Sequence, residues 1–83
     1  MKQKVPEQKL KELLSKIFEV PLNDISDNAT PDTIETWDSL RHMSLVIALE
    51  QAFNVELSDD QVVEILSYKL IKIVLEERGV EFS

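Results

Sequence analysis

The 83-residue chain contains no cysteine, one glycine (Gly79) and one histidine (His42). Without cysteine it can form neither a disulfide nor a thiolate nucleophile, and one histidine is too few for a structural zinc site of about four Cys or His ligands. A dinucleotide fingerprint or a P-loop needs two or three glycines, so both are excluded. The chain's own side chains offer little for chemistry, and we predict no catalytic residue and no metal ligand.

The chain also lacks a long hydrophobic run. No apolar segment approaches the roughly 20 residues of a membrane span, and Met1–Leu10 has no hydrophobic signal-peptide core. We therefore expect a cytoplasmic, monomeric protein with no membrane partner. Because so short a chain buries only about 60% of its unfolded surface, residues 1–83 are expected to form a single domain.

The net charge of −7 is unevenly distributed. Residues 1–16 hold five lysines against two glutamates, whereas residues 17–66 hold eleven acidic residues against Arg41 alone, a net charge of −10. Such a surface repels nucleic acid and speeds encounter with basic protein patches. Charge alone is equally consistent with acidity that only keeps a small protein soluble.

The first third of the chain predicts one amphipathic helix and a long loop. After Pro6, apolar residues recur at helical spacing (Leu10, Leu13, Leu14, Ile17 and Phe18), and Pro21 should end this helix near Val20. Residues 21–38 are rich in Asn, Asp, Ser and Pro, which is typical of a loop. Its scattered apolar residues are expected to fasten it to the core: Ile25, Ala29, Ile34 and Trp37.

A second helix is predicted over Leu40–Phe53, after the capping residues Asp38 and Ser39. At about 100° per residue it is apolar on two sides. The stripe expected in the core contains Leu45, Val46, Leu49 and Phe53, and the second contains Leu40, Met43 and Ile47. The second stripe is either buried between helices or presented to a partner.

The remaining residues predict a short helix over Gln61–Ile65 after a Ser58 cap, and a last helix over Tyr68–Arg78 capped by Ser67 and followed by Gly79. The side chains expected to point inward are Val62, Ile65, Leu66, Leu70, Ile71, Val74 and Leu75, whereas Lys69, Lys72 and Glu76 should face water. No strand-like alternation is present. The predicted fold is all-α: a four-helix bundle with three longer helices, one short third helix, and a long loop between the first and second helices.

The sequence Trp37-Asp38-Ser39-Leu40 lies where the loop meets the head of the second helix. An exposed helix N-terminus has unpaired N–H groups and a positive dipole, both of which favour a phosphate group. Taken alone, the motif is better explained as an ordinary Asp/Ser cap.

The order of elements around this motif resembles the acyl carrier protein family, the phosphopantetheine-dependent carriers. The resemblance covers nearly the whole chain. Besides Asp38-Ser39-Leu40, it rests on four segments: Val20-Pro21 through Ile25, Asp27-Asn28-Ala29, residues 45–53 and residues 55–60.

The resemblance implies that Ser39 carries 4′-phosphopantetheine derived from coenzyme A, within a motif formed by Trp37, Asp38 and Leu40. The chain would then be a carrier and not an enzyme. It would hold an acyl intermediate as a thioester and deliver it to enzymes of fatty-acid-like, lipid, polyketide or other specialised biosynthesis. The missing cysteine is explained, because the reactive thiol belongs to the prosthetic arm.

The implied partners are a phosphopantetheinyl transferase (holo-acyl-carrier-protein synthase), an acyl-loading ligase or acyltransferase, and downstream synthases with basic patches. By the same resemblance, the docking residues would be Leu40, Met43, Ile47, Glu50, Asp59, Asp60 and Glu64. The alternatives are internal contacts for the apolar residues and a solvated surface for the acidic ones.

Two departures from the housekeeping fatty-acid carriers point to a specialised member. Thr36 and Trp37 lie where those carriers usually have a glycine followed by a small or hydrophobic residue. The second helix starts Arg41-His42 and has Glu50 as its only acidic residue as far as Phe53, where those carriers have several. Trp37 either lines a cargo pocket or anchors the loop. His42 is expected to be partly buried and not to act as a base.

Two other functions stay open from the sequence. One is an aminoacyl or peptidyl carrier, which uses the same chemistry with a different cargo. The other is an unmodified acidic helical adaptor that binds a basic partner.

Overall fold

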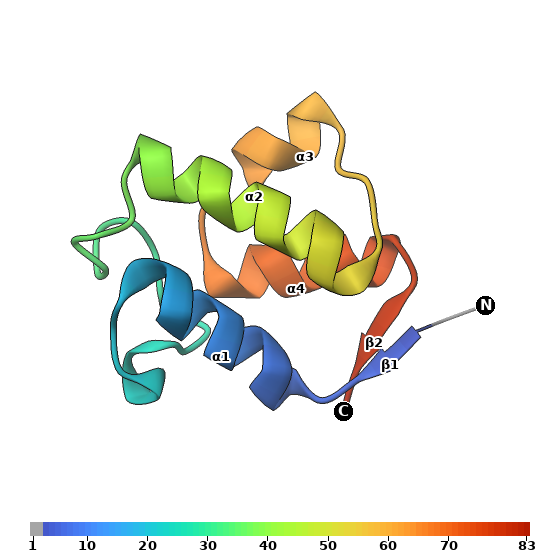
Figure 1. The fold of residues 1–83 in the computed structure, drawn as a ribbon, viewed down its shortest axis with the longest axis horizontal. Helices are drawn as coiled ribbons and strands as arrows, with labels where there is room; N and C mark the ends of the chain where they lie inside the picture. Colours follow the sequence, from blue (N-terminus) through green and yellow to red (C-terminus); the bar gives the residue numbers. More distant parts are fainter. Residues whose placement is uncertain (1–2) are drawn as a thin grey trace.

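A computed structural model describes residues 3–83. The elements in chain order are β1 (Gln3–Val5), α1 (Glu7–Phe18), the 3₁₀ turn η1 (Leu22–Asp24), α2 (Ser39–Phe53), α3 (Asp59–Glu64), α4 (Tyr68–Glu77) and β2 (Val80–Phe82). The predicted bundle of three longer helices and one short third helix is confirmed. In the view of Figure 1, α3 lies on the side of α2 away from α1.

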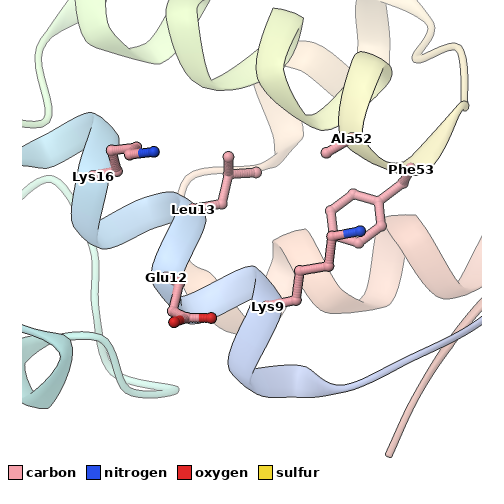
Figure 2. Close-up of a pocket in the computed structure, with 6 residues that line it drawn as sticks. All are labelled: Lys9, Glu12, Leu13, Lys16, Ala52 and Phe53. Atoms are coloured by element: carbon pink, nitrogen blue, oxygen red, sulfur yellow. The ribbon is translucent and has the colours of Figure 1, made fainter.

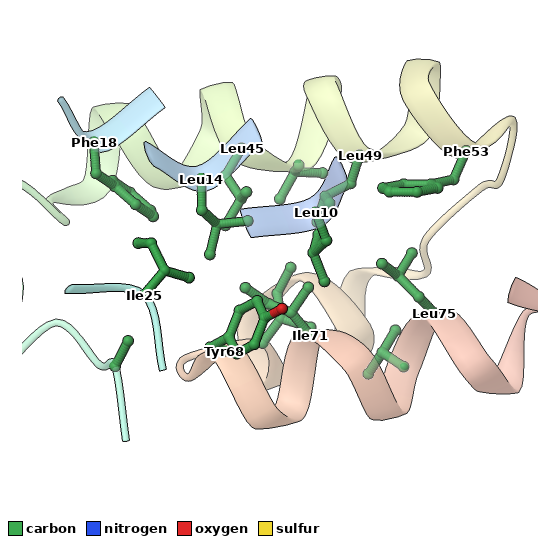
Figure 3. Packing of buried hydrophobic residues seen from close by; sticks show 14 of the residues in the cluster. Leu10, Leu14, Phe18, Ile25, Leu45, Leu49, Phe53, Tyr68, Ile71 and Leu75 are labelled. Carbon is green, nitrogen blue, oxygen red and sulfur yellow. The ribbon is translucent and has the colours of Figure 1, made fainter. Parts of the chain in front are cut away.

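The core lies between α1, α2 and α4 (Figure 3). Each helix contributes side chains that are less than 2% exposed: Leu10, Leu14 and Phe18 from α1, Leu45, Leu49 and Phe53 from α2, and Tyr68, Ile71 and Leu75 from α4. The core stripe predicted for α2 is therefore confirmed. The Tyr68 hydroxyl donates a hydrogen bond to Glu7 Oε2 at 2.9 Å, so its polar atom is satisfied despite burial.

The long loop between α1 and α2 is fastened to the core, as predicted. Ile25, Ala29, Ile34 and Trp37 are each no more than 5% exposed. The Tyr68 N–H at the start of α4 donates to the Ala29 carbonyl at 3.0 Å.

Lys72 of α4 also holds this loop, and the prediction that it faces water is wrong. Its Nζ lies 2.8 Å from Asp27 Oδ1 and 3.5 Å from Glu7 Oε2. Burial alone would lower the pKa of Lys72, but the hydrogen bond to Asp27 and the charge of Glu7 raise it overall. The same hydrogen bond and the charge of Lys72 lower the pKa of Asp27 below its usual 3.8. The sequence pattern places Lys72 on the exposed face of its helix, and only the tertiary structure brings the carboxylates of Glu7 and Asp27 close to it.

The expectation that the chain has no strand is wrong. β1 and β2 form a parallel pair in which Gln3, Lys4 and Val5 lie opposite Val80, Glu81 and Phe82. Two segments of three residues are too short to show alternation, and they meet only because α1 and α4 bring the two ends of the chain together.

Several helix boundaries differ slightly from those predicted. α1 ends at Phe18, before the predicted Val20, because Glu19 adopts a left-handed conformation with φ of 56°. α3 begins at Asp59, where Ser58 and Gln61 form a capping box. None of its six residues is buried, and Leu66, which was expected in the core, is 49% exposed. Ile65, which directly follows α3, is 0% exposed, and Val62 is partly buried against the core, so both side chains anchor this segment.

Candidate functional site

The head of α2 is built by Asp38, the residue that caps it. Asp38 is extended, with φ of −104° and ψ of −179°, and its Oδ1 accepts a hydrogen bond from the Arg41 N–H at 2.8 Å. This is the arrangement of an ordinary N-cap. The cap leaves Ser39 as the first helical residue, and its side chain is free for other uses.

Ser39 is exposed to solvent at the positive end of a 15-residue helix. The N–H groups of Ser39 and Leu40 belong to the first turn of α2, in which backbone donors have no partner within the helix. Unpaired donors and the helix dipole both favour negative charge next to this hydroxyl. The serine therefore lies where a phosphate ester is electrostatically stabilised.

Two side chains tie the head of α2 to the end of α1. Thr36 Oγ1 donates to the Phe18 carbonyl at 2.6 Å, and Arg41 Nη1 donates to the Ile17 carbonyl at 2.6 Å. Arg41 Nη2 also pairs with Glu19 Oε2 at 2.7 Å. The last carbonyls of a helix have no intrahelical partner, so Thr36 and Arg41 provide hydrogen-bond donors for the C-terminal carbonyls of α1. The same contacts position the head of α2, where Ser39 lies. The positive charge of Arg41 is thus already engaged.

Trp37 and His42 form a hydrogen-bonded pair, with their rings nearly coplanar, in the same groove as Ser39. Trp37 is 5% exposed and stacks on Phe18 with ring centroids 4.7 Å apart, so the prediction that it anchors the loop is confirmed. Its Nε1–H donates to His42 Nδ1 at 3.0 Å. His42 is half-buried, as expected, and its Nε2 lies 2.7 Å from the Val62 carbonyl of α3.

A groove of about 590 Å³ begins at Ser39 and runs between the loop, α2 and α3. The residues that line it are Pro31, Trp37, Asp38, Ser39, His42, Met43, Val62, Val63 and Leu66. Most of these side chains are apolar. The structure therefore joins an exposed serine to an apolar surface that extends along α3.

The second apolar stripe of α2 is exposed, with 78% of Leu40, 50% of Met43 and 53% of Ile47 accessible. Of the two alternatives for this stripe, burial between helices is therefore wrong. Asp59, Asp60 and Glu64 are exposed on the neighbouring α3. Glu50 differs from them, because it is half-buried and its Oε2 accepts a hydrogen bond from the Leu57 N–H at 3.0 Å. Glu50 thus holds the segment that follows α2.

A second groove, of about 370 Å³, lies between α1 and α2 at the opposite end of α2 (Figure 2). It is lined by Lys9, Glu12, Leu13, Lys16, Ala52 and Phe53, with Lys9 Nζ 5.8 Å from the centre of the Phe53 ring. Its lining residues include no hydroxyl that could carry a phosphate ester. The groove at Ser39 is therefore the better candidate site.

Sequence reasoning missed part of the candidate site. It placed Leu66 in the core, and it assigned no role at the site to Pro31, Val62 or Val63, all of which line the groove. The adjacent pair Val62-Val63 on a short helix was a usable signal, because both residues cannot point into the core. No sequence signal could have paired Arg41 with Ile17, since that contact depends on the angle between two helices.

Within residues 3–83, none of the helices has both the length and the apolar character needed to cross a membrane. This holds for the 15-residue α2 as well as for the shorter helices.

Comparison with known proteins gives the same assignment from two directions. Residues 8–71 match the family described as "Phosphopantetheine attachment site". The chain is also similar to the acyl carrier protein of Buchnera aphidicola subsp. Schizaphis graminum (strain Sg), with 35% identity over 54 residues. That alignment covers 65% of this chain and 68% of the relative.

Among solved structures, the fold resembles the solution structure of a holo acyl carrier protein from Geobacter metallireducens. The TM-score is 0.76, and the match covers 86% of this chain and 82% of the other. At 17% identity, this similarity speaks for the fold alone.

The family match spans most of the chain and includes the head of α2, where Ser39 lies. Members of such a family bear 4′-phosphopantetheine and carry substrates for other enzymes, so the cofactor and the absence of intrinsic catalysis are as expected. Membership also implies interaction with a phosphopantetheinyl transferase and with biosynthetic enzymes. The chain therefore belongs to the acyl carrier protein family of phosphopantetheine attachment domains.

Proposed function

We propose that Ser39 is the attachment residue and that the chain carries an acyl intermediate as a thioester to partner enzymes of a specialised biosynthetic pathway. One observation carries this proposal. Ser39 is exposed as the first residue of α2, while Asp38 provides the cap and leaves the serine hydroxyl free. If the motif were only an Asp/Ser cap, Asp38 would be sufficient, and the exposure of Ser39 beside a groove would have no explanation.

The residues at the head of α2 fit the phosphate of the cofactor. The Ser39 and Leu40 N–H groups and the helix dipole favour the charge that a phosphodiester brings. In the loading step, Ser39 Oγ bonds to the phosphorus on the pantetheine side of coenzyme A, and the pyrophosphate P–O bond breaks. 3′,5′-ADP leaves, and the hydroxyl proton passes to a base of the transferase. Once attached, the arm supplies the thiol that the chain lacks.

The docking surface that we propose is the exposed stripe of Leu40, Met43 and Ile47 next to the acidic side chains of Asp59, Asp60 and Glu64. Exposed apolar residues rimmed by charge are typical of protein interaction sites. Met43 is suited to successive partners because its flexible thioether adapts to different surfaces. The acidic rim favours partners with basic patches, including the transferase, an acyl-loading ligase or acyltransferase, and downstream synthases.

A specialised pathway is supported by the residues that replace the housekeeping pattern. Thr36 and Arg41 donate hydrogen bonds to α1, Trp37 stacks on Phe18 of α1, and His42 lies within hydrogen-bond distance of the Val62 carbonyl of α3. Substitution of these positions would disturb the packing around Ser39, so they are part of how this chain presents its serine. An aminoacyl or peptidyl cargo is the second candidate, because it uses the same serine.

The first testable prediction concerns attachment. Incubation with coenzyme A and a broad-specificity phosphopantetheinyl transferase should add one phosphopantetheine group, measured by intact mass. Ser39→Ala should gain none, because it lacks the nucleophile. The matched control is Ser44→Ala, which removes another exposed serine of α2 and should be loaded like the unchanged chain.

Three outcomes separate the candidate functions. No gain with several transferases would contradict a carrier and favour the unmodified adaptor. A gain that persists in Ser39→Ala would contradict the choice of residue alone. After loading, acceptance of amino acids by a ligase in preference to fatty acids would favour the aminoacyl carrier.

A further inference from the structure

A single histidine joins the three segments that border the groove at Ser39. His42 of α2 accepts from Trp37 Nε1–H at Nδ1 (3.0 Å) and faces the Val62 carbonyl with Nε2 (2.7 Å). Only a neutral ring with its proton on Nε2 satisfies both contacts, because Trp Nε1 is a donor and a carbonyl is an acceptor. We refer to Trp37, His42 and Val62 as the His42 bridge.

The His42 bridge contacts α3 near its C-terminal end. The Val62 carbonyl belongs to the last turn of α3, in which carbonyls lack intrahelical partners. α3 has no fully buried residue and packs against the core through the partly buried Val62 and the adjacent Ile65, so the hydrogen bond from His42 adds to a small apolar contact. The His42 bridge therefore closes the seam between α2 and α3 next to Ser39.

The His42 bridge is packed against buried side chains. Trp37 stacks on Phe18, which is 0% exposed, and Leu45 and Ile65 are also 0% exposed. A chain that entered the core from Ser39 would have to break two hydrogen bonds and displace close-packed side chains. The groove outside the bridge needs neither change, because it is already open and apolar.

The floor of the groove, formed by Trp37 and His42, has its polar side-chain atoms already paired, and the other polar lining residues are Asp38, which caps α2, and Ser39 itself. Trp37 Nε1 and both ring nitrogens of His42 are satisfied within the chain. A polar cargo would therefore find no free partner on this floor, whereas Met43, Val63 and Leu66 offer exposed apolar surface. This chemistry favours an unsubstituted aliphatic acyl group.

We infer that the His42 bridge excludes the cargo from the core, so that an aliphatic acyl chain attached through Ser39 lies in the surface groove against Met43, Val63 and Leu66. This inference rests on the proposed function, because it needs Ser39 to carry the arm. It assigns the groove as the cargo site and makes His42 a positioning residue.

The test compares two loaded forms of the full chain by NMR. One form carries unacylated phosphopantetheine and the other a non-hydrolysable octanoyl amide analogue, both attached by the transferase and verified by intact mass. We expect the octanoyl form to shift the methyl signals of Met43, Val63 and Leu66 and the Trp37 indole N–H signal. The methyl signals of Leu49, Ile71 and Leu75 should stay within the line width.

The two failures are distinguishable. Absence of the mass gain contradicts the proposed function, and the inference falls with it. A verified mass gain with larger shifts at Leu49, Ile71 and Leu75 than in the groove leaves the carrier intact and overturns the surface location.

Substitution of His42 tests the bridge itself. His42→Phe keeps a ring but removes both hydrogen bonds, and in its octanoyl form we expect new shifts at the core methyl groups. His42→Gln can still accept from Trp37 and donate to Val62, so it should retain the groove pattern. Gln51→Ala, an exposed change on the same helix, is the matched control and should behave like the unchanged chain.

An unchanged groove pattern in His42→Phe would show that the bridge is not the barrier and would overturn its role. Loss of fold in that variant is detected from the spread of its amide signals. In that case His42→Gln decides the question, because core shifts in this folded variant overturn the bridge and a retained groove pattern supports it.

Discussion

The three longer helices and α3 differ in how they are held. α1, α2 and α4 each contribute side chains at less than 2% exposure, whereas none of the six residues of α3 is buried. α3 is held instead by the partly buried Val62, by Ile65, by the His42 bridge and by hydrogen bonds from Arg78 to Gln61 at 2.6 and 3.1 Å. The bundle therefore joins a rigid three-helix core to a lightly attached fourth element.

This difference has a consequence for the proposed carrier. Ser39 begins α2, and Thr36 and Arg41 bind the head of α2 to α1, so the serine belongs to the rigid part. The opposite wall of the groove belongs to α3, which few contacts hold in place. A firmly attached serine beside a wall that the His42 bridge keeps against α2 suits a carrier that presents its cargo at the surface.

The largest loss of unfolding free energy is expected from truncation of a core side chain. Leu49→Ala should lower the free energy of unfolding by about 2–5 kcal/mol, because it removes buried methyl groups and leaves a cavity. Val63→Ala on α3 should change it by no more than about 0.5 kcal/mol, because Val63 is 68% exposed. Urea unfolding of both variants measures the two changes in unfolding free energy. Equal losses in Leu49→Ala and Val63→Ala would show that α3 is as tightly integrated as the core.

An intermediate effect is expected at the head of α2. Arg41→Met removes the bonds to the Ile17 carbonyl and to Glu19 and should cost about 1–2 kcal/mol of unfolding free energy, since its side chain is 34% exposed. Lys69→Met, an equal loss of charge at an exposed position of α4, is the control and should stay within about 0.5 kcal/mol. If urea unfolding gives Arg41→Met no greater loss than the control, the head of α2 is not fastened through this side chain.

The smallest loss of stability is expected when the ion pair between Asp27 of the loop and Lys72 is removed. Lys72 lowers the pKa of Asp27 below 3.8, so the ionised carboxylate stabilises the folded state above that value, and the contribution is lost as pH falls through the lower folded pKa. Asp27→Asn should therefore be less stable than the unchanged chain at neutral pH, with a difference that disappears in acid. Thermal unfolding across pH 2–7, with Asp32→Asn as the control, measures this. A difference that persists at the acid end would contradict the ion pair as its source.

Much of the fold could be predicted because helical periodicity is a local signal. The core stripe of α2, the caps at Asp38, Ser58 and Ser67, and the anchoring residues of the loop all follow from residue type and spacing. The strands could not be predicted, because Gln3–Val5 and Val80–Phe82 are too short to show a period.

The candidate site divides in the same way. Ser39 and its motif could be singled out from the sequence, because the order of elements around Asp38-Ser39-Leu40 resembles the acyl carrier protein family, whereas the tripeptide alone favours an ordinary helix cap. The groove could not, because Val63 and Leu66 become its wall only through the position of α3. Lys72 was misplaced for the same reason, since its carboxylate partners come from α1 and the loop.

The sequence by itself determined the helices, the exposed serine and the lack of a thiol, because each depends on neighbouring residues or on composition. Only the tertiary structure decided that His42 joins Trp37 to Val62, that Arg41 and Thr36 complete α1, and that an apolar groove begins at Ser39. These contacts link residues 5 to 24 positions apart. Their geometry is set by the packing of whole helices, and no local pattern encodes it.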